Sequence, residues 1–247
     1  MSGHSKWATI RRAKGATDAK RGALFTRLGR EVMVAAKEGG GNPESNIRLR
    51  LAIEKARAGN MPKDNIQRAI DRATGSGADG VVYEEITYES YLPHKVPALI
   101  RVMTDNKNRT AADVRKILTR SGGILGEGAS VAWQFDRKGY ILIERTNKID
   151  PDAVFEVAAE AGADDIQTSD EVIEIYTSVD SFRAVRDALA SKGYALASAE
   201  VSMIPSTQTS LNKEETEKVL EIIDALEEMD DVQDVYHNLE VTEEITA

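Results

Sequence analysis

Six short segments of alternating strand and helix character fill the stretch 140–203, and their order constrains the fold more than any other feature. Runs rich in β-branched and aromatic residues predict strands, and apolar periods of 3.6 residues predict helices. We expect Asp150 and Asp180 to cap the two helices, and Gly162 and Gly193 to end them. The segments are a strand at 140–144, a helix at 151–161, strands at 164–168 and 171–177, a helix at 180–191 and a strand at 194–203. This β-α-β-β-α-β order is that of a ferredoxin-like unit.

A second set of predicted elements lies on both sides of this unit along the chain. Those before it are strands at 85–91, 97–103 and 130–135, and a helix at 110–121 with Thr110 and Asp113 as a capping pair. Those after it are strands at 206–210 and 232–237, and a helix at 213–228 opened by Asn212. Neither half is complete alone, so we predict that 81–136 and 205–247 join into one split α+β domain, with 137–204 inserted as the ferredoxin-like domain. Three sequential domains are the alternative.

The first third of the chain has helical periodicity instead. Helices are predicted at 23–38, from Asn42-Pro43 to about 58, and after Pro62 up to about 74. The glycine-rich stretch 75–80 then predicts a linker. The expected fold is therefore α+β: a basic arm and three-helix domain over 1–76, followed by two ferredoxin-like α+β domains, one inserted in the other.

Charge is distributed very unevenly between these parts. The first 74 residues contain 16 Lys and Arg against 7 Asp and Glu, and the remainder contains 16 against 34. The two parts thus carry about +9 and −18, which together give the net −9. A cluster of cations on one part of a chain favours binding to a polyanion, because each phosphate that is neutralised releases condensed counterions. The alternative is that these cations are solvated faces of ordinary helices.

The candidate nucleic-acid contacts follow from this asymmetry. Trp7, within the basic arm 1–22, either stacks on a base or anchors the arm on the protein's own core. The loop 104–110 joins a strand to a helix N-terminus, where free backbone amides favour anions; the alternative there is an ordinary capped turn. The predicted nucleic-acid-binding residues are Lys6, Trp7, Arg11, Arg12, Lys14, Lys20, Arg21, Arg48, Lys55, Lys63, Lys107 and Arg109.

Several kinds of enzyme site are excluded by the same sequence. The chain has no cysteine, and its three histidines are scattered through different segments. The glycine-rich segment 123–130 has the spacing of a phosphate-binding loop, but Ala129 stands where the lysine is required. We therefore expect no catalytic residue, cofactor, metal or small-molecule substrate. Without a signal-peptide core or an apolar run long enough to cross a bilayer, we also expect a cytoplasmic protein with no membrane partner.

Motifs spread along the whole chain resemble the YebC/PmpR family. They are Gly3-His4-Ser5-Lys6-Trp7, Ala35-Ala36-Lys37, Asn60-Met61-Pro62-Lys63-Asp64-Asn65-Ile66, Thr104-Asp105-Asn106, Asn108-Arg109-Thr110, and Gly122-Gly123 before Val131-Ala132-Trp133-Gln134-Phe135. The resemblance implies a helical N-terminal domain and two α+β domains. The chain departs from the family over 90–97, where proline and larger residues replace a glycine-rich turn.

The function that the resemblance implies has two forms. Bacterial members are described as DNA-binding transcriptional regulators. The family also includes the mitochondrial translational activator of a cytochrome oxidase subunit, and bacterial relatives have been proposed to act on stalled ribosomes. We predict a non-enzymatic, DNA-binding transcriptional regulator, with a translation factor that binds rRNA or tRNA on the ribosome as the alternative.

Other observations from the sequence bear on that choice. The link between the second and third helices is expected to be longer than that of a helix-turn-helix, which leaves the DNA assignment dependent on the resemblance. A protein-interaction scaffold and a phosphate-ester hydrolase are further alternatives. The scaffold would form complexes that survive high salt, and the hydrolase would require a metal-dependent activity.

Overall fold

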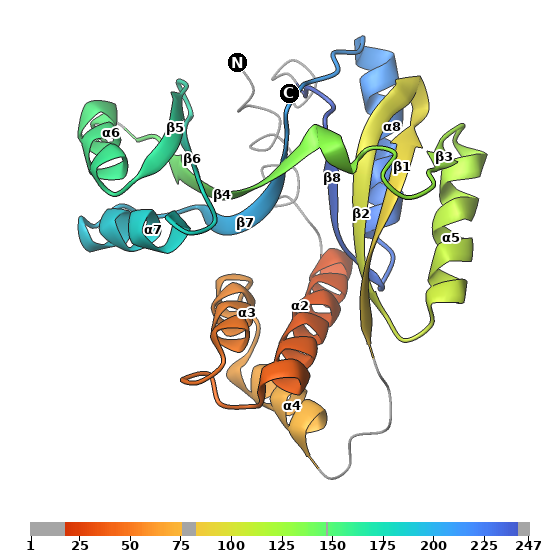
Figure 1. The fold of residues 1–247 in the computed structure, drawn as a ribbon, viewed down its shortest axis with the longest axis horizontal. Coiled ribbons are helices and arrows are strands. Elements are labelled where there is room, and N and C mark those ends of the chain that lie inside the picture. Colours follow the sequence, from red (N-terminus) through yellow and green to blue (C-terminus); the bar gives the residue numbers. More distant parts are fainter. Residues whose placement is uncertain (1–17, 76–82, 147, 242–247) are drawn as a thin grey trace. The chain divides into compact units, whose positions relative to one another are not determined.

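The computed structural model describes residues 18–75, 83–146 and 148–241 (Figure 1). Its elements group into two compact units. One comprises the helical segment and the first sheet, up to Ser130, with Glu217–Val235; the other comprises the second sheet within Val131–Thr216 and the residues from Tyr236 on. The predicted α+β class is confirmed. The predicted division into three domains, one of them inserted in another, stays a prediction.

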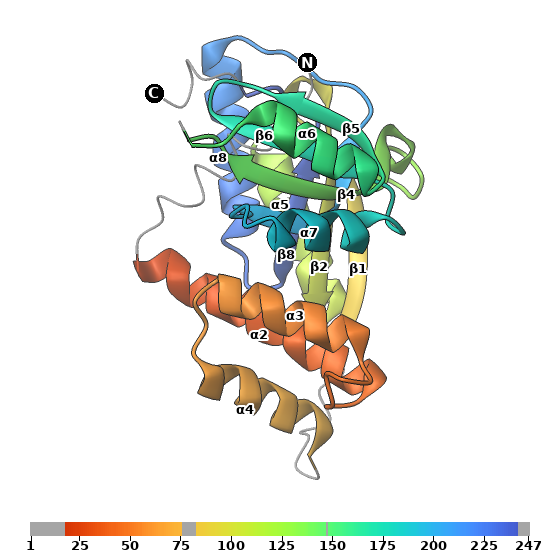
Figure 2. The same ribbon diagram turned by 90° about the vertical axis from the view of Figure 1, so that its left-hand side faces the viewer.

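The helical segment contains α2 (Asp18–Gly39), α3 (Ile47–Ala58) and α4 (Lys63–Thr74). Helices α3 and α4 both pack mainly against α2 (Figure 2). Leu28, Val32, Leu49, Ile53 and Ile66 are among the residues of the shared core, and none is more than 8% exposed. Because the apolar stripes face inward, the charged residues between them face outward.

The second helix begins later than predicted. Asn42 and Pro43 form a turn, and α3 starts after Asn46, whose side chain accepts a hydrogen bond from the Leu49 amide at 3.0 Å. The Asn46 amide group also donates to the carbonyls of Ala35 at 2.7 Å and Gly40 at 2.8 Å. Asn46 is thus a cap that also satisfies the end of α2, a tertiary role that outweighs the local pattern at Asn42.

The link from α3 to α4 is Gly59–Pro62, four residues. The expectation of a link too long for a helix-turn-helix is therefore wrong. The packing of α3 and α4 is what distinguishes this arrangement from a helix-turn-helix, because both helices contact α2 far more than they contact each other.

The first sheet has the strand order β3-β1-β2-β8. Its strands are β1 (Glu84–Leu92), β2 (Val96–Thr104), β3 (Ile124–Leu125) and β8 (Val232–His237), and its helices are α5 (Lys107–Arg120) and α8 (Lys213–Glu227). Two predicted strands are absent from it. Residues 132–134 form a 3₁₀ turn, and the segment near 206–210 makes one isolated bridge, between Thr209 and Leu239.

The places of those two strands are taken by β3 and β1. The segments β2-α5-β3 and α8-β8 supply five of the six elements of a ferredoxin-like unit. The remaining strand position is occupied by β1, which precedes β2 in the chain. The spatial order is thus preserved while the chain order is permuted. Helix α5 also begins at Lys107 after the cap Asn106, not at Thr110 as predicted.

The β1–β2 hairpin contains the segment in which the chain departs from the family. Pro93–Lys95 form its turn, with φ at 60° for His94 and 63° for Lys95. Both angles lie in the left-handed region, which glycine adopts without steric cost. The turn therefore places side chains at two positions where glycine would be the easier residue.

The second sheet has the order β5-β6-β4-β7, with each neighbouring pair antiparallel. Its elements are β4 (Phe135–Glu144), α6 (Pro151–Glu160), β5 (Ala163–Thr168), β6 (Val172–Thr177), α7 (Phe182–Ser191) and β7 (Ser198–Pro205). One face of the sheet packs on both helices through a core that includes Ile141, Ile173, Val154 and Leu189. The ferredoxin-like unit is confirmed.

Helix α7 differs from its predicted start. Its N-terminal cap is Ser181, which makes no side-chain capping bond, and Asp180 does not act as the cap. Asp150 caps α6 as predicted, accepting from the Asp152 amide at 3.1 Å.

Candidate nucleic-acid interface

The predicted contact residues fall into three groups. Lys6, Trp7, Arg11, Arg12 and Lys14 lie outside the described residues, and Lys20 and Arg21 lie within α2. The rest are Arg48 and Lys55 on α3, Lys63 on α4, and Lys107 and Arg109 at the start of α5. Their role in binding nucleic acid stays a prediction.

Arg48 and Lys55 make ion pairs within the protein. Arg48 pairs with Glu38 of α2 and with Glu85 of β1, the latter at 2.6 Å, and Lys55 lies 3.3 Å from Glu31. Burial raises the pKa of Glu85, but hydrogen bonds from Arg101 and Arg48 outweigh it, so the pKa lies below its ordinary value. Arg48 thus links the helical segment to the first sheet, whereas Lys55 pairs within the helical segment, and part of the charge of both cations is neutralised.

The loop before α5 is likewise engaged internally. Arg109 lies 2.9 Å from Asp105 and 2.9 Å from Asp231. The backbone carbonyl of Lys107 accepts a hydrogen bond from the Tyr88 hydroxyl at 3.2 Å, while Lys107 itself is exposed. Asn106 caps the helix by accepting from the Arg109 amide. The structure thus places two carboxylates beside Arg109, and phosphate contact by this loop stays a prediction.

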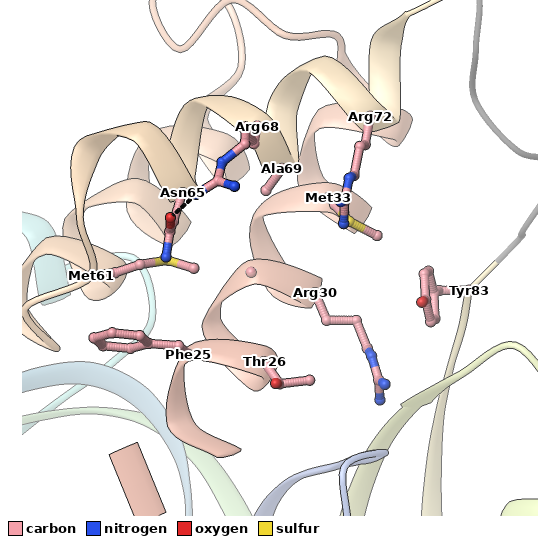
Figure 3. A pocket seen from close by; sticks show the side chains of 11 residues that line it. Phe25, Thr26, Arg30, Met33, Met61, Asn65, Arg68, Ala69, Arg72 and Tyr83 are labelled. Atoms are coloured by element: carbon pink, nitrogen blue, oxygen red, sulfur yellow. Dashed lines mark hydrogen bonds between the residues drawn. The ribbon is translucent and has the colours of Figure 1, made fainter. Parts of the chain in front are cut away.

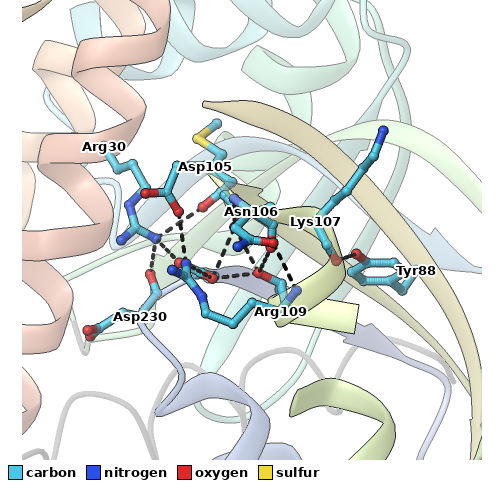
Figure 4. Close-up of polar contacts among 11 residues, drawn as sticks. Arg30, Tyr88, Asp105, Asn106, Lys107, Arg109 and Asp230 are labelled. Carbon is cyan, nitrogen blue, oxygen red and sulfur yellow. Dashed lines mark hydrogen bonds and ion pairs between the residues drawn. The ribbon is translucent and has the colours of Figure 1, made fainter. Parts of the chain in front are cut away.

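A buried carboxylate, Asp231, joins α2, β2 and α5. It accepts hydrogen bonds from Arg30 at 2.8 Å, Arg109 at 2.9 Å, Thr104 at 3.1 Å and Thr110 at 2.6 Å (Figure 4). We call these five residues the Asp231 cluster. Burial raises the pKa of Asp231, but the hydrogen bonds and the charge of Arg30 outweigh it and lower the pKa from its ordinary value.

Arg30 is fixed by more than this carboxylate. Its guanidinium also donates to the carbonyls of Met103 at 3.0 Å and Asp230 at 2.6 Å. The same group lies over the ring of Tyr83, 5.1 Å from the ring centroid. The cluster therefore positions both Arg30 and Tyr83 at the edge of the helical segment.

A groove of about 380 Å³ lies between α2 and α4 (Figure 3). We call it the α2–α4 groove. Its apolar residues include Phe25, Met33 and Met61, and Arg68 and Arg72 of α4 line its opposite wall. The described residues that line it are Phe25, Thr26, Gly29, Arg30, Met33, Met61, Asn65, Arg68, Ala69, Arg72 and Tyr83.

Several exposed cations of the helical segment pair with no carboxylate among the described residues. Across the part of the chain that the structure describes, no ion pair is found for Arg57, Lys63, Arg68 or Arg72. Of these four, only Lys63 is among the predicted nucleic-acid-binding residues. The spacing of Arg68 and Arg72, one turn apart and away from the buried Ile66 and Ile70, is the signal that could have identified the pair.

Two family models together match nearly the whole chain. Residues 5–76 match the model described as the TACO1/YebC protein N-terminal domain, and residues 83–239 match the TACO1/YebC second and third domain. The chain belongs to the TACO1/YebC family. The resemblance of the sequence motifs to the YebC/PmpR family is thereby confirmed.

Similar proteins cover almost the same length. A probable transcriptional regulatory protein of Trichlorobacter lovleyi is 54% identical over 98% of this chain and 97% of its own. A protein with the same description from Dictyoglomus turgidum is 52% identical over 99% of this chain and 98% of its own. A conserved hypothetical protein, Aq1575 of Aquifex aeolicus, has a crystal structure that is similar to this one, with a TM-score of 0.83. Its sequence is 41% identical, and the match covers 94% of this chain and 95% of that chain.

The described residues also bear on a membrane segment and a metal site. Among the described residues, no helix is both long and apolar enough to cross a membrane. Within the same residues, no group of three or more histidines and carboxylates is placed to hold a metal ion.

Proposed function

We propose that this TACO1/YebC family member is a cytoplasmic regulator of gene expression that acts by binding nucleic acid, without catalysing a reaction. Duplex DNA is the proposed ligand, in line with the description of its relatives as probable transcriptional regulatory proteins. The helical segment would dock on the sugar–phosphate backbone, and the two sheets would support it or recruit partners.

The observation that carries this proposal is the set of exposed cations without partner carboxylates on α3 and α4. Arg57, Lys63, Arg68 and Arg72 lie in the part of the chain whose charge is strongly positive. Cations that are already paired gain less from a phosphate, because the existing pair must be broken. The unpaired ones are free to release counterions from a nucleic acid.

A salt titration tests the proposal. The full chain is bound to a labelled 20-base-pair duplex and the affinity is measured by fluorescence anisotropy between about 50 and 200 mM salt. We expect the logarithm of the affinity to fall linearly with the logarithm of the salt concentration, with a slope of about −0.9 per phosphate contact. Affinity that does not change with salt would contradict the proposal.

A second candidate is a regulator of translation that binds rRNA or tRNA. The α2–α4 groove favours it, because its apolar floor suits the face of an unstacked base, which duplex DNA does not present. Ribosome-bound protein challenged with excess duplex DNA separates the two candidates. Displacement by DNA supports the transcriptional regulator, and retention near physiological salt supports the translation factor.

A further inference from the structure

We propose that the α2–α4 groove holds one unpaired nucleotide of the bound strand, with its base on the apolar floor and its phosphate on Arg68 and Arg72. This inference rests on the proposed binding of nucleic acid and adds the kind of nucleotide that the helical segment selects. The groove lies within a single compact unit of the structure.

The floor of the groove has the chemistry of a stacking surface. Phe25, Met33 and Met61 all line the groove (Figure 3). At Gly29 an added Cβ would lie 3.3 Å from the Met61 methyl group, so the glycine keeps this part of the floor open. Thioethers and aromatic rings both make favourable contacts with an aromatic face, whichever base provides it.

Two arginines of α4 give one wall positive charge, while the third arginine of the lining, Arg30, is paired with Asp231. No Asp or Glu is among the described residues that line the groove, whereas Arg30, Arg68 and Arg72 are. The Arg68 guanidinium donates to the Asn65 side chain and to the Asp64 carbonyl at 3.3 Å, so its charge is oriented but not neutralised. Guanidinium groups bind phosphate oxygens through two parallel hydrogen bonds.

The far wall is held in position before any ligand arrives. Tyr83 lies under the Arg30 guanidinium, and Arg30 is fixed by Asp231 and by two backbone carbonyls. A wall that is already ordered loses little conformational freedom when a base binds. Thr26 and Asn65, at the rim, supply polar groups for the edge of a base.

These features select an unpaired nucleotide over a paired one. In a duplex each base face is covered by its neighbours, so only edges and phosphates reach a protein. A bulge, loop or single-stranded end presents a free base face together with an adjacent phosphate. The volume of about 380 Å³ lies at the lower end of the range for small-ligand sites and suits one flat ring system.

The test compares two hairpins that differ by one nucleotide. One carries a single bulged 2-aminopurine in its stem, the other has the same stem fully paired, and both are made as RNA and as DNA. We expect the full chain to bind the bulged hairpin at least about fivefold more tightly than the paired one, from the typical strength of base stacking on aromatic side chains. The 2-aminopurine fluorescence should change on binding.

Three variants show whether the groove is responsible. Arg72→Gln removes a groove cation, Thr26→Trp places a bulky ring at the rim, and Arg57→Gln is the matched control, since Arg57 is an exposed helical arginine outside the groove. We expect the first two to abolish the preference for the bulge. Arg57→Gln should keep it while weakening both hairpins equally.

The outcomes separate this inference from the proposed function. A preference for the bulge in RNA, in DNA or in both, lost in the two groove variants, supports the inference and identifies the strand. Equal binding of bulged and paired hairpins overturns the inference alone, as does a preference that Arg72→Gln and Thr26→Trp leave unchanged. If neither the bulged nor the paired hairpin binds at about 100 mM salt, the proposed function is overturned as well.

Discussion

Replacing Asp231 with asparagine removes the negative charge of the Asp231 cluster. The side chains of Asp231 and Arg30 are only 10% and 12% exposed, and the two are 2.8 Å apart. Asparagine keeps the size and one acceptor oxygen. It does not keep the charge, so Arg30 is left with a partner too weak to offset its lost hydration.

The expected cost follows from the individual contacts. Breaking a fully buried ion pair costs about 3–5 kcal/mol. The Arg109 side chain is 50% exposed and regains water when its partner is lost, so the estimate depends on Arg30 and on the bonds from Thr104 and Thr110. We expect Asp231→Asn to lower the free energy of unfolding by about 2–3 kcal/mol.

Urea unfolding followed by circular dichroism measures this loss. A decrease of that size should move the midpoint of the transition of this unit by about 1 M urea. Asp230→Asn is the matched control, because Asp230 is exposed and its backbone carbonyl, not its side chain, contacts Arg30. If the two variants unfold within about 0.5 kcal/mol of each other, the assigned role of the cluster is refuted.

The same carboxylate predicts a dependence on pH. The folded-state pKa of Asp231 is lowered, so the folded protein binds fewer protons than the unfolded chain in the acid range. Its stabilisation is therefore present above about pH 4, the usual pKa of aspartate, and is lost as the pH falls through the lowered pKa. The difference between wild type and Asp231→Asn should be largest near neutral pH and shrink in acid.

Two further substitutions test the fold. Asn46→Ala removes the α3 cap and leaves the Ala35 carbonyl without its donor, so thermal or urea unfolding should show a loss of about 2–3 kcal/mol; a loss below about 0.5 kcal/mol would contradict the capping role. Gly139→Ala places a Cβ against Thr177 and 2.6 Å from the Phe182 ring, so the second sheet should lose stability by about 1–3 kcal/mol. Hydrogen exchange in β4 would measure that loss, and unchanged protection would show that the strand can move aside.

Local sequence patterns predicted most of the elements because their causes are local. The apolar periods of α2, α3 and α4 follow from the face that each helix buries, and the runs of β-branched and aromatic residues predicted strands of the second sheet. Strand pairing is different. The strand position expected for 206–210 is taken by β1. Nine residues of β1 pair with β2 in a hairpin, which gives many more backbone hydrogen bonds than the single bridge at Thr209.

The candidate site was predicted only in outline. The basic character of the helical segment follows from counting charges. The pairing of Arg48 with Glu85 and of Arg109 with Asp231 does not, because the partners are 37 and 122 residues away along the chain. The α2–α4 groove was missed for the same reason: Arg68 and Arg72 become one wall of a site only when α2 and Tyr83 supply the others.

The central claim is that exposed cations of the helical segment carry nucleic-acid binding. The triple variant Lys63→Gln, Arg68→Gln, Arg72→Gln tests it, with the same loss of charge at three exposed cations of the other unit, Arg137, Lys148 and Lys192, as the control.

The measurement is the slope of log affinity against log salt for a labelled 20-base-pair duplex. We expect the helical triple variant to flatten the slope by about 2–3 and the control triple to leave it unchanged. Equal slopes for the helical triple variant and wild type, or equal flattening by both triples, would contradict it.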